Sequence, residues 1–210
     1  MYQFGRLLTL QGDPRETMPW ATEVTAHVNS LTDMNVTLWG TVFGYPVGTL
    51  AWSAIVEGRA QLGAEMVKMP ADNAYLDLVS KAQDWVTAPA QDIFRKVVHG
   101  GPGDAPPAVG AVASITQAVA ATGKMPEAVA WAVDMAQHAS SVTGTNVSLL
   151  VNAYGDFGGM AFISTVADMA TADAAADALQ ADADYVGKIG ASSGLFVDGS
   201  AHQSLLQRLA

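Results

Sequence analysis

The chain has 210 residues, half of them hydrophobic and only 14% charged, which indicates a folded globular protein rather than a disordered one. Its formal net charge of −10, with ten Lys plus Arg, argues against nucleic acid or an anionic membrane surface as a partner. The absence of cysteine excludes disulfides, thiolate metal sites and a cysteine nucleophile.

The N-terminal segment, MYQFGRLLTLQGDPRE, lacks the basic stretch followed by an apolar stretch that marks a secretory signal peptide. No apolar run approaches the roughly 18–20 residues that a membrane-spanning helix needs. We therefore expect a soluble, cytoplasmic protein without a membrane partner.

The hydrophobic pattern of the first half predicts strands alternating with helices. Apolar residues three to four apart form a stripe from Trp20 to Leu31, which is typical of a helix with one buried face. Two β-rich runs follow, and the short connection GYPVG between them is typical of a hairpin. The expected elements are a strand at 6–10, a helix around 20–31, strands at 36–43 and 49–56, a helix at 71–86 and a strand at 94–98.

The second half repeats the first. The stretch NVTLWGTVFG at 35–44 returns as NVSLLVNAYG at 146–155, a displacement of 111 positions. Identical pairs at this displacement include Trp20/Trp131, His27/His138, Ser30/Ser141, Asn35/Asn146, Gly44/Gly155 and Ser53/Ser164. Self-similarity at a fixed period indicates that a structural unit has been duplicated.

Beyond Glu57 we expect the displacement to shorten to 100, which aligns DWV at 84–86 with DYV at 184–186. The second copy is then predicted to contain a strand at 112–115, a helix from Trp131 to Val142, a hairpin, a helix at 171–186 and a strand at 195–197. A stretch rich in Gly and Pro separates the copies. The predicted organisation is a first repeat at 1–100, a linker at 101–109 and a second repeat at 110–210.

Each copy has the order β-α-β-β-α-β, which is the ferredoxin-like unit. In this unit the helices cover one face of an antiparallel sheet, and a wet opposite face would require alternating polar residues. The strands TLAWSAIV and MAFISTVA are instead largely apolar on both faces, so both faces must be covered. We therefore predict an α+β fold in which two tandem ferredoxin-like repeats pack sheet to sheet.

This arrangement resembles the dimeric α+β barrel superfamily with both halves fused in one chain. That superfamily includes cofactor-independent monooxygenases of antibiotic biosynthesis, haem-degrading monooxygenases, chlorite-dismutase-like haem proteins and small isomerases. The resemblance implies a ligand pocket between sheet and helices, and it implies assembly into homo-oligomers. No catalytic motif of a particular family accompanies it.

Two histidines are the candidate catalytic residues. Trp20 and His27 lie seven residues apart, as do Trp131 and His138, so each pair shares one face of its helix. Each histidine could serve as a base or hydrogen-bond donor in a pocket walled by its tryptophan. The alternative is a buried histidine with a satisfied hydrogen bond. We expect one histidine to line a pocket while its twin is only packed.

Further aromatic and polar side chains extend the candidate ligand-binding set. It comprises Trp20, Trp131, Trp39, Trp52, Asn152 and Tyr154. A mostly apolar cavity with a few polar groups suits a planar or aromatic small molecule, although ordinary core packing explains the tryptophans equally well. The histidines show no metal-binding spacing, so no metal site is expected.

Three functional hypotheses follow. The first is binding of a small apolar or aromatic metabolite, with cofactor-independent conversion of the oxygenase or isomerase type. The second is a non-catalytic protein of the same fold that binds a ligand or a partner. The third is a haem-binding barrel with His27 or His138 as axial ligand.

Overall fold

The computed structural model describes residues 1–103 and 105–210. The first repeat contains β1 (Tyr2–Thr9), α1 (Pro14–Leu31), β2 (Thr37–Phe43), β3 (Thr49–Val56), α2 (Arg59–Met66), α3 (Asn73–Ser80) and β4 (Gln91–His99). The second contains β5 (Val112–Val119), α4 (Met125–Thr143), β6 (Val147–Asn152), β7 (Gly159–Val166), α5 (Met169–Ala181), α6 (Ala183–Ala191) and β8 (His202–Arg208).

The eight strands form one closed antiparallel barrel in the order β1-β3-β2-β8-β5-β7-β6-β4. Each repeat contributes four neighbouring strands, and the two sheets join along the seams β2–β8 and β4–β6. Every strand is therefore paired on both sides, which removes the exposed edges that an isolated sheet would present. The predicted fold, two ferredoxin-like repeats in a fused barrel, is confirmed.

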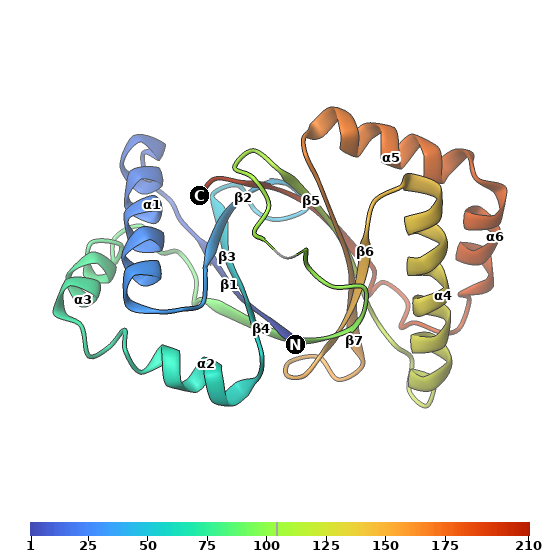
Figure 1. Cartoon of the computed structure of the whole chain (residues 1–210), viewed down its shortest axis with the longest axis horizontal. Coiled ribbons are helices and arrows are strands. Elements are labelled where there is room, and N and C mark those ends of the chain that lie inside the picture. The colour runs from blue at the N-terminus through green and yellow to red at the C-terminus, as the bar shows by residue number, and fades with distance from the viewer. Residues whose placement is uncertain (104) are drawn as a thin grey trace.

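The helices cover the barrel on two opposite sides (Figure 1), with α1, α2 and α3 over the first sheet and α4, α5 and α6 over the second. Strand residues alternate between a helix-facing side and the barrel interior. Trp52 packs in the cluster beneath the helices of the first repeat, whereas its neighbour Ala51 packs with Leu7, Trp39 and Leu206 in the interior. This double coverage explains why the strands are apolar on both faces.

Aspartate side chains begin four of the helices. Asp13, Asp72, Asp168 and Asp182 each accept a hydrogen bond from a backbone N–H in the first turn of the helix that follows. Such caps satisfy donors that have no partner inside the helix. At the other end of a helix, Gly144 stops α4 in a left-handed conformation with φ of 68°.

The predicted end of the second repeat was wrong. Its last strand is β8 at His202–Arg208, whereas 195–197 contributes only an isolated bridge between Ala120 and Phe196. That bridge matches the bridge between Leu10 and Val86 in the first repeat, at a displacement of 110. The displacement thus never shortens to 100, since it is 110 both for these bridges and for the matching pairs of β1–β3 and β5–β7.

The helices before the last strand also differ from prediction. The segment at 59–66, for which no helix was predicted, forms α2, and α5 occupies the matching place in the second copy. The helix expected at 71–86 ends at Ser80, and the one expected at 171–186 breaks at Asp182. Asp182 favours the second break, since it caps the start of α6, whereas the chain after Ser80 continues as turns.

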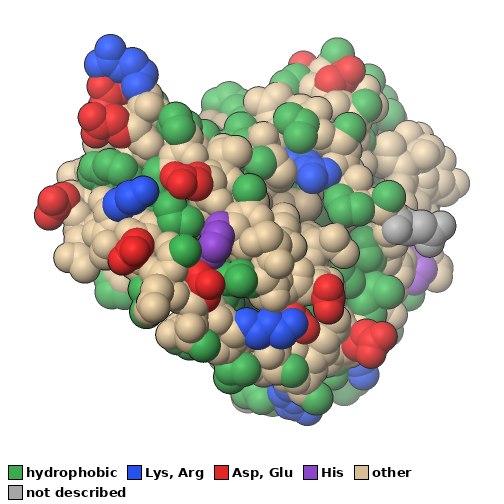
Figure 2. Space-filling model, turned by 60° about the vertical axis from the view of Figure 1, so that its left-hand side comes forward, with side chains coloured by type: hydrophobic (Ala, Val, Ile, Leu, Met, Phe, Trp, Pro, Cys, Tyr) green, Lys and Arg blue, Asp and Glu red, His purple; other side chains and the backbone are tan. Residues whose placement is uncertain are grey.

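On the face shown in Figure 2, basic and acidic side chains are dispersed among apolar and neutral ones. No helix within the described residues has both the length and the apolar character needed to cross a bilayer.

Candidate functional site

Trp20 holds the first helical layer together. Its side chain is 6% exposed, and its indole N–H donates to the Leu78 carbonyl at 2.8 Å, which joins α1 to α3. It meets Trp52 and Trp85 edge to face, with ring centroids 6.2 and 5.9 Å away. Such geometry is favoured between aromatic rings in a core.

Trp131 makes the equivalent contacts in the second repeat. Its indole N–H donates to the Lys188 carbonyl at 3.0 Å, and its ring meets Phe162 and Phe196 edge to face. The two predicted pocket tryptophans therefore pack one helix against another at matched positions. A ligand-binding role for either stays a prediction.

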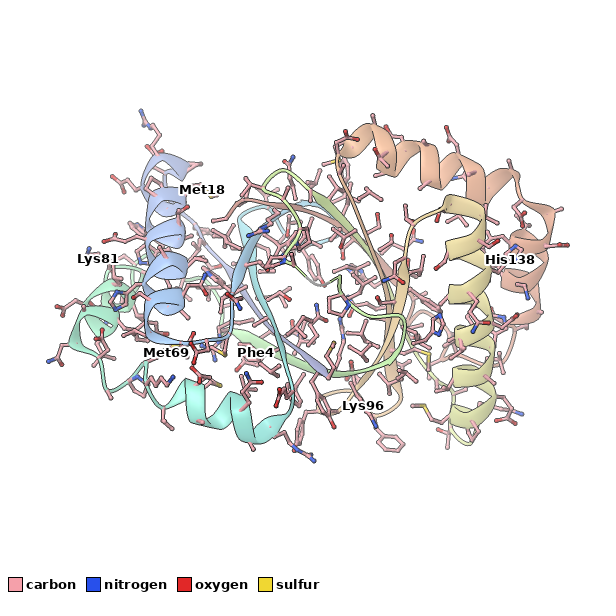
Figure 3. All side chains as sticks on the ribbon, viewed as in Figure 1. Phe4, Met18, Met69, Lys81, Lys96 and His138 are labelled. Carbon is pink, nitrogen blue, oxygen red and sulfur yellow. The ribbon has the colours of Figure 1, made fainter. Side chains whose placement is uncertain are left out.

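The two histidines contact capping aspartates. His27 Nε2 lies 2.8 Å from Asp72 Oδ1, and Asp72 also accepts the Tyr75 N–H at the start of α3. His138 Nε2 lies 2.8 Å from Asp182 Oδ1 at the start of α6. Figure 3 shows His138 on α4 beside α6. The histidine side chains are 24% and 23% exposed, so their surroundings are alike.

Nothing in these surroundings singles out one histidine as a pocket residue. Neither lines either of the two cavities described below. The twins instead form a His–Asp clamp in each repeat, with Asp72 and Asp182 joining the first helix of the repeat to the cap of a later one. Catalysis by His27 or His138 stays a prediction, and neither of these two cavities lies beside either histidine.

The clamps should make stability depend on pH. The hydrogen bond with His27, followed by that from the Tyr75 N–H, lowers the pKa of Asp72, and His138 and Tyr185 act likewise on Asp182. An aspartate with a depressed folded pKa stabilises the fold above its unfolded pKa of about 3.9 and loses that contribution as pH falls through the folded value. We expect Asp72→Asn and Asp182→Asn to lower the melting temperature at pH 7 and to approach the unmodified chain below about pH 3.

Circular dichroism melts from pH 2.5 to 7 would measure this difference. His27→Ala and His138→Ala serve as controls, and they should lower the melting temperature at pH 7 by similar amounts. A gap between the Asn variants and the unmodified chain that stayed constant down to pH 2.5 would contradict the charged clamp.

The remaining predicted residues fall into separate places. Trp39 is buried in the barrel interior with its indole N–H on Thr37 Oγ1 at 2.8 Å, and Trp52 donates to Thr25 Oγ1 at 2.9 Å beneath the helices. Asn152 lies at one mouth of the barrel. Tyr154, 60% exposed, is the one member of the set that lines the larger cavity.

That larger cavity, the α2 groove, lies between α2 and the helix-facing side of the first sheet. Its volume is about 350 Å³. From α2 it is lined by Arg59, Leu62, Gly63 and Met66, and from the strands by Phe4, Asp92, Ile93 and Phe94. Phe4 is seen on the sheet near α2 in Figure 3. The groove lies between sheet and helices, where the resemblance had implied a ligand pocket.

Aromatic rings line the groove, and Tyr2 packs against one of them from outside the lining. Tyr2 stacks on Phe94 with centroids 4.9 Å apart, and Phe94 lies 6.1 Å from the ring of Tyr154. The Arg59 guanidinium donates to the Tyr154 hydroxyl at 3.1 Å and lies 5.9 Å from the ring centroid. These contacts place aromatic rings beside one cationic group.

A fixed ion pair borders the groove. Arg6 Nε and Nη2 donate to the two oxygens of Asp92 at 2.7 and 2.8 Å. The hydrogen bond with Asp92 raises the pKa of Arg6, and the one with Tyr154 raises the pKa of Arg59. Arg6 is paired with Asp92, so the cation that the groove offers to a ligand is Arg59, beside the apolar carbon of the lining.

Sequence reasoning missed most of this site. Arg59, Leu62 and Met66 lie on a helix that the sequence had not predicted, and Phe94 was assigned only to a strand. The signal that could have found α2 is the pair Leu62 and Met66, spaced four apart after Gly58.

No protein-family model matches the sequence, and no curated protein matches it either. Solved structures share the fold over the whole chain. A candidate monooxygenase from Fusobacterium nucleatum aligns with a TM-score of 0.73 and 11% identity, covering 100% of this chain and 92% of that one. An anthrone oxidase-like protein gives 0.67 and 13%, covering 100% and 91%. LmHde, a heme-degrading enzyme from Listeria monocytogenes, gives 0.54 and 10%, covering 99% of each. These likenesses show that the chain has the dimeric α+β barrel fold with both halves in one chain.

Proposed function

We propose that the chain binds a small apolar or aromatic molecule in the α2 groove and converts it there without a cofactor, by chemistry of the oxygenase or isomerase type. The observation that carries the binding step is the pair of rings Phe94 and Tyr154 beside the cationic Arg59 in a groove of about 350 Å³. This volume lies within the range of small-molecule pockets, and apolar walls with few polar groups are typical of them.

The oxygenase part of the proposal is supported by the names of the structural neighbours, a candidate monooxygenase and an anthrone oxidase-like protein. Anthrone is a flat tricyclic ketone of the kind that the aromatic lining would accept. Its oxidation consumes one O₂ and yields anthraquinone and one water. Anthrone therefore serves both as a ligand and as a reporter of turnover.

Haem does not fit the residues of the groove. No histidine lines it, and the two histidines predicted as axial ligands contact Asp72 and Asp182 outside both cavities. A proximal histidine is a common axial ligand of haem iron. The histidines predicted for that role are therefore not placed to hold haem in the groove.

Gly63 allows a direct test of binding. It lies on α2, and a Cβ added there meets no atom within 4 Å, so the side chain of Gly63→Leu has room to occupy the groove. Replacing a glycine inside a helix also favours the fold by about 0.5–1 kcal/mol. We expect Gly63→Leu to weaken binding of the neutral fluorophore N-phenyl-1-naphthylamine by about tenfold or more.

The matched control is Gly187→Leu on α6, an exposed glycine whose added Cβ is equally free of contacts. It should leave the affinity unchanged, as measured by fluorescence titration. If Gly63→Leu and Gly187→Leu bound the fluorophore with equal affinity, the α2 groove would not be its binding site. Binding of anthrone without O₂ uptake above the rate in buffer would favour the non-catalytic alternative.

A further inference from the structure

A second cavity opens at one mouth of the barrel, on the side of β4 opposite to the α2 groove. It measures about 190 Å³ and is lined mainly by the ends of the second-repeat strands. Phe94 faces the groove, whereas its neighbour Arg95 points into this cavity. The two cavities are therefore separated by the strand itself.

Arg95 is a buried cation without a counter-ion. It is only 6% exposed, and it takes part in none of the ion pairs between described residues. Its Nε donates to Asn152 Oδ1 at 3.0 Å, and its Nη2 donates to Gln117 Oε1. These neutral amide oxygens use two of the five N–H groups of a guanidinium. Burial lowers the pKa of Arg95, but arginine stays protonated in proteins.

The amides that hold Arg95 are themselves held in place. Gln117 Nε2 donates to the Tyr45 hydroxyl at 3.0 Å, so its oxygen is turned toward Arg95. The Tyr45 ring lies 5.3 Å from the ring of His202, which also lines the cavity. The guanidinium is thus oriented by a network from both repeats.

The matching position on the other side of the barrel shows what this place holds when it is merely packed. Strand pairing makes Leu206 the counterpart of Arg95, because each lies opposite the matching residue of the first strand in its repeat. By the same register, Leu7 corresponds to Gln117 and Thr41 to Asn152. Leu7 and Leu206 are 8% and 4% exposed and pack together in the interior. One side of the barrel interior is apolar at this level, and the other side carries the cation.

We propose that this mouth binds a small organic carboxylate, with Arg95 as its charge partner. A buried, unpaired charge is costly, and an anion that reaches it removes that cost. The guanidinium fork matches the two oxygens of a carboxylate, and Ala118, Val119 and Met160 offer apolar contact for the rest of the molecule. Asp156, exposed at the rim of the cavity, opposes an incoming anion.

Benzoate and its neutral counterpart benzamide test the proposal on the full chain. Isothermal titration calorimetry should show saturable binding of benzoate and at least about tenfold weaker binding of benzamide. Arg95→Leu should abolish benzoate binding without lowering the melting temperature, because leucine already occupies the matching position 206. Gln117→Leu should keep the charge but weaken binding, and Asp156→Asn should strengthen it.

The Gly63→Leu variant separates this site from the α2 groove, since it should leave benzoate affinity unchanged. Equal affinities for benzoate and benzamide would overturn the proposal. So would undiminished benzoate binding by a folded Arg95→Leu variant. Binding of inorganic phosphate in preference to benzoate would overturn the assignment to a carboxylate.

Discussion

Replacing Trp20 with alanine should lower the free energy of unfolding by about 3–5 kcal/mol, the range for removing a large buried aromatic side chain. Trp20 is 6% exposed and packs edge to face on two other tryptophans. Its indole N–H donates a hydrogen bond to the Leu78 carbonyl on α3. Its loss leaves a cavity between α1, the sheet and α3. Urea denaturation followed by circular dichroism measures the change.

Two matched variants sharpen this prediction. Trp131→Ala should cost less, because Trp131 is only half-buried although it occupies the same place in the second repeat. Trp20→Phe keeps an aromatic ring but leaves the Leu78 carbonyl without its donor. Its loss of unfolding free energy should therefore lie between those of Trp20→Ala and Trp131→Ala. If Trp20→Ala kept its stability and lost binding of N-phenyl-1-naphthylamine, Trp20 would be a ligand residue after all.

The fold was predictable because the duplication repeats a pattern that is itself informative. NVTLWGTVFG and NVSLLVNAYG indicate the same strand in both copies. The apolar residues on both faces of the strands indicate that both faces of each sheet are buried. The helices before each last strand were harder to place. Ala and Asp dominate 168–184, so the sequence there has few distinctive residues to align. DYV at 184–186 was therefore wrongly matched to DWV at 84–86, which corresponds to 194–196.

The candidate sites were less predictable for a different reason. The role of a strand residue depends on the face to which it turns, and a shift by one position reverses that face. Phe94 and Arg95 are neighbours in sequence but belong to different cavities. The aromatic residues that stood out, Trp20, Trp39 and Trp52, do so because they pack the core.

Separating the two proposed repeats should show how strongly each depends on the other. Expressed alone, a chain of residues 1–100 exposes the edges of β2 and β4, and a chain of residues 110–210 exposes those of β6 and β8. Unpaired edges and an open apolar interior favour association. We expect neither piece to be a folded monomer, and co-expression to give a 1:1 complex by light scattering. Two stable monomers would contradict the fused barrel as a single cooperative unit.

The hydrogen bonds of Arg95 predict which of the two pieces associate with each other. A homodimer of residues 1–100 could form both seams, but each Arg95 would then face Leu7 and Thr41, the counterparts of Gln117 and Asn152, and would lose both amide partners. A buried guanidinium stripped of its partners costs about 3–5 kcal/mol. The first piece should therefore self-associate poorly and pair readily with the second. Arg95→Leu removes this penalty, so that variant of residues 1–100 should form a stable homodimer. If the unmodified piece formed an equally stable homodimer, the network would not determine the pairing.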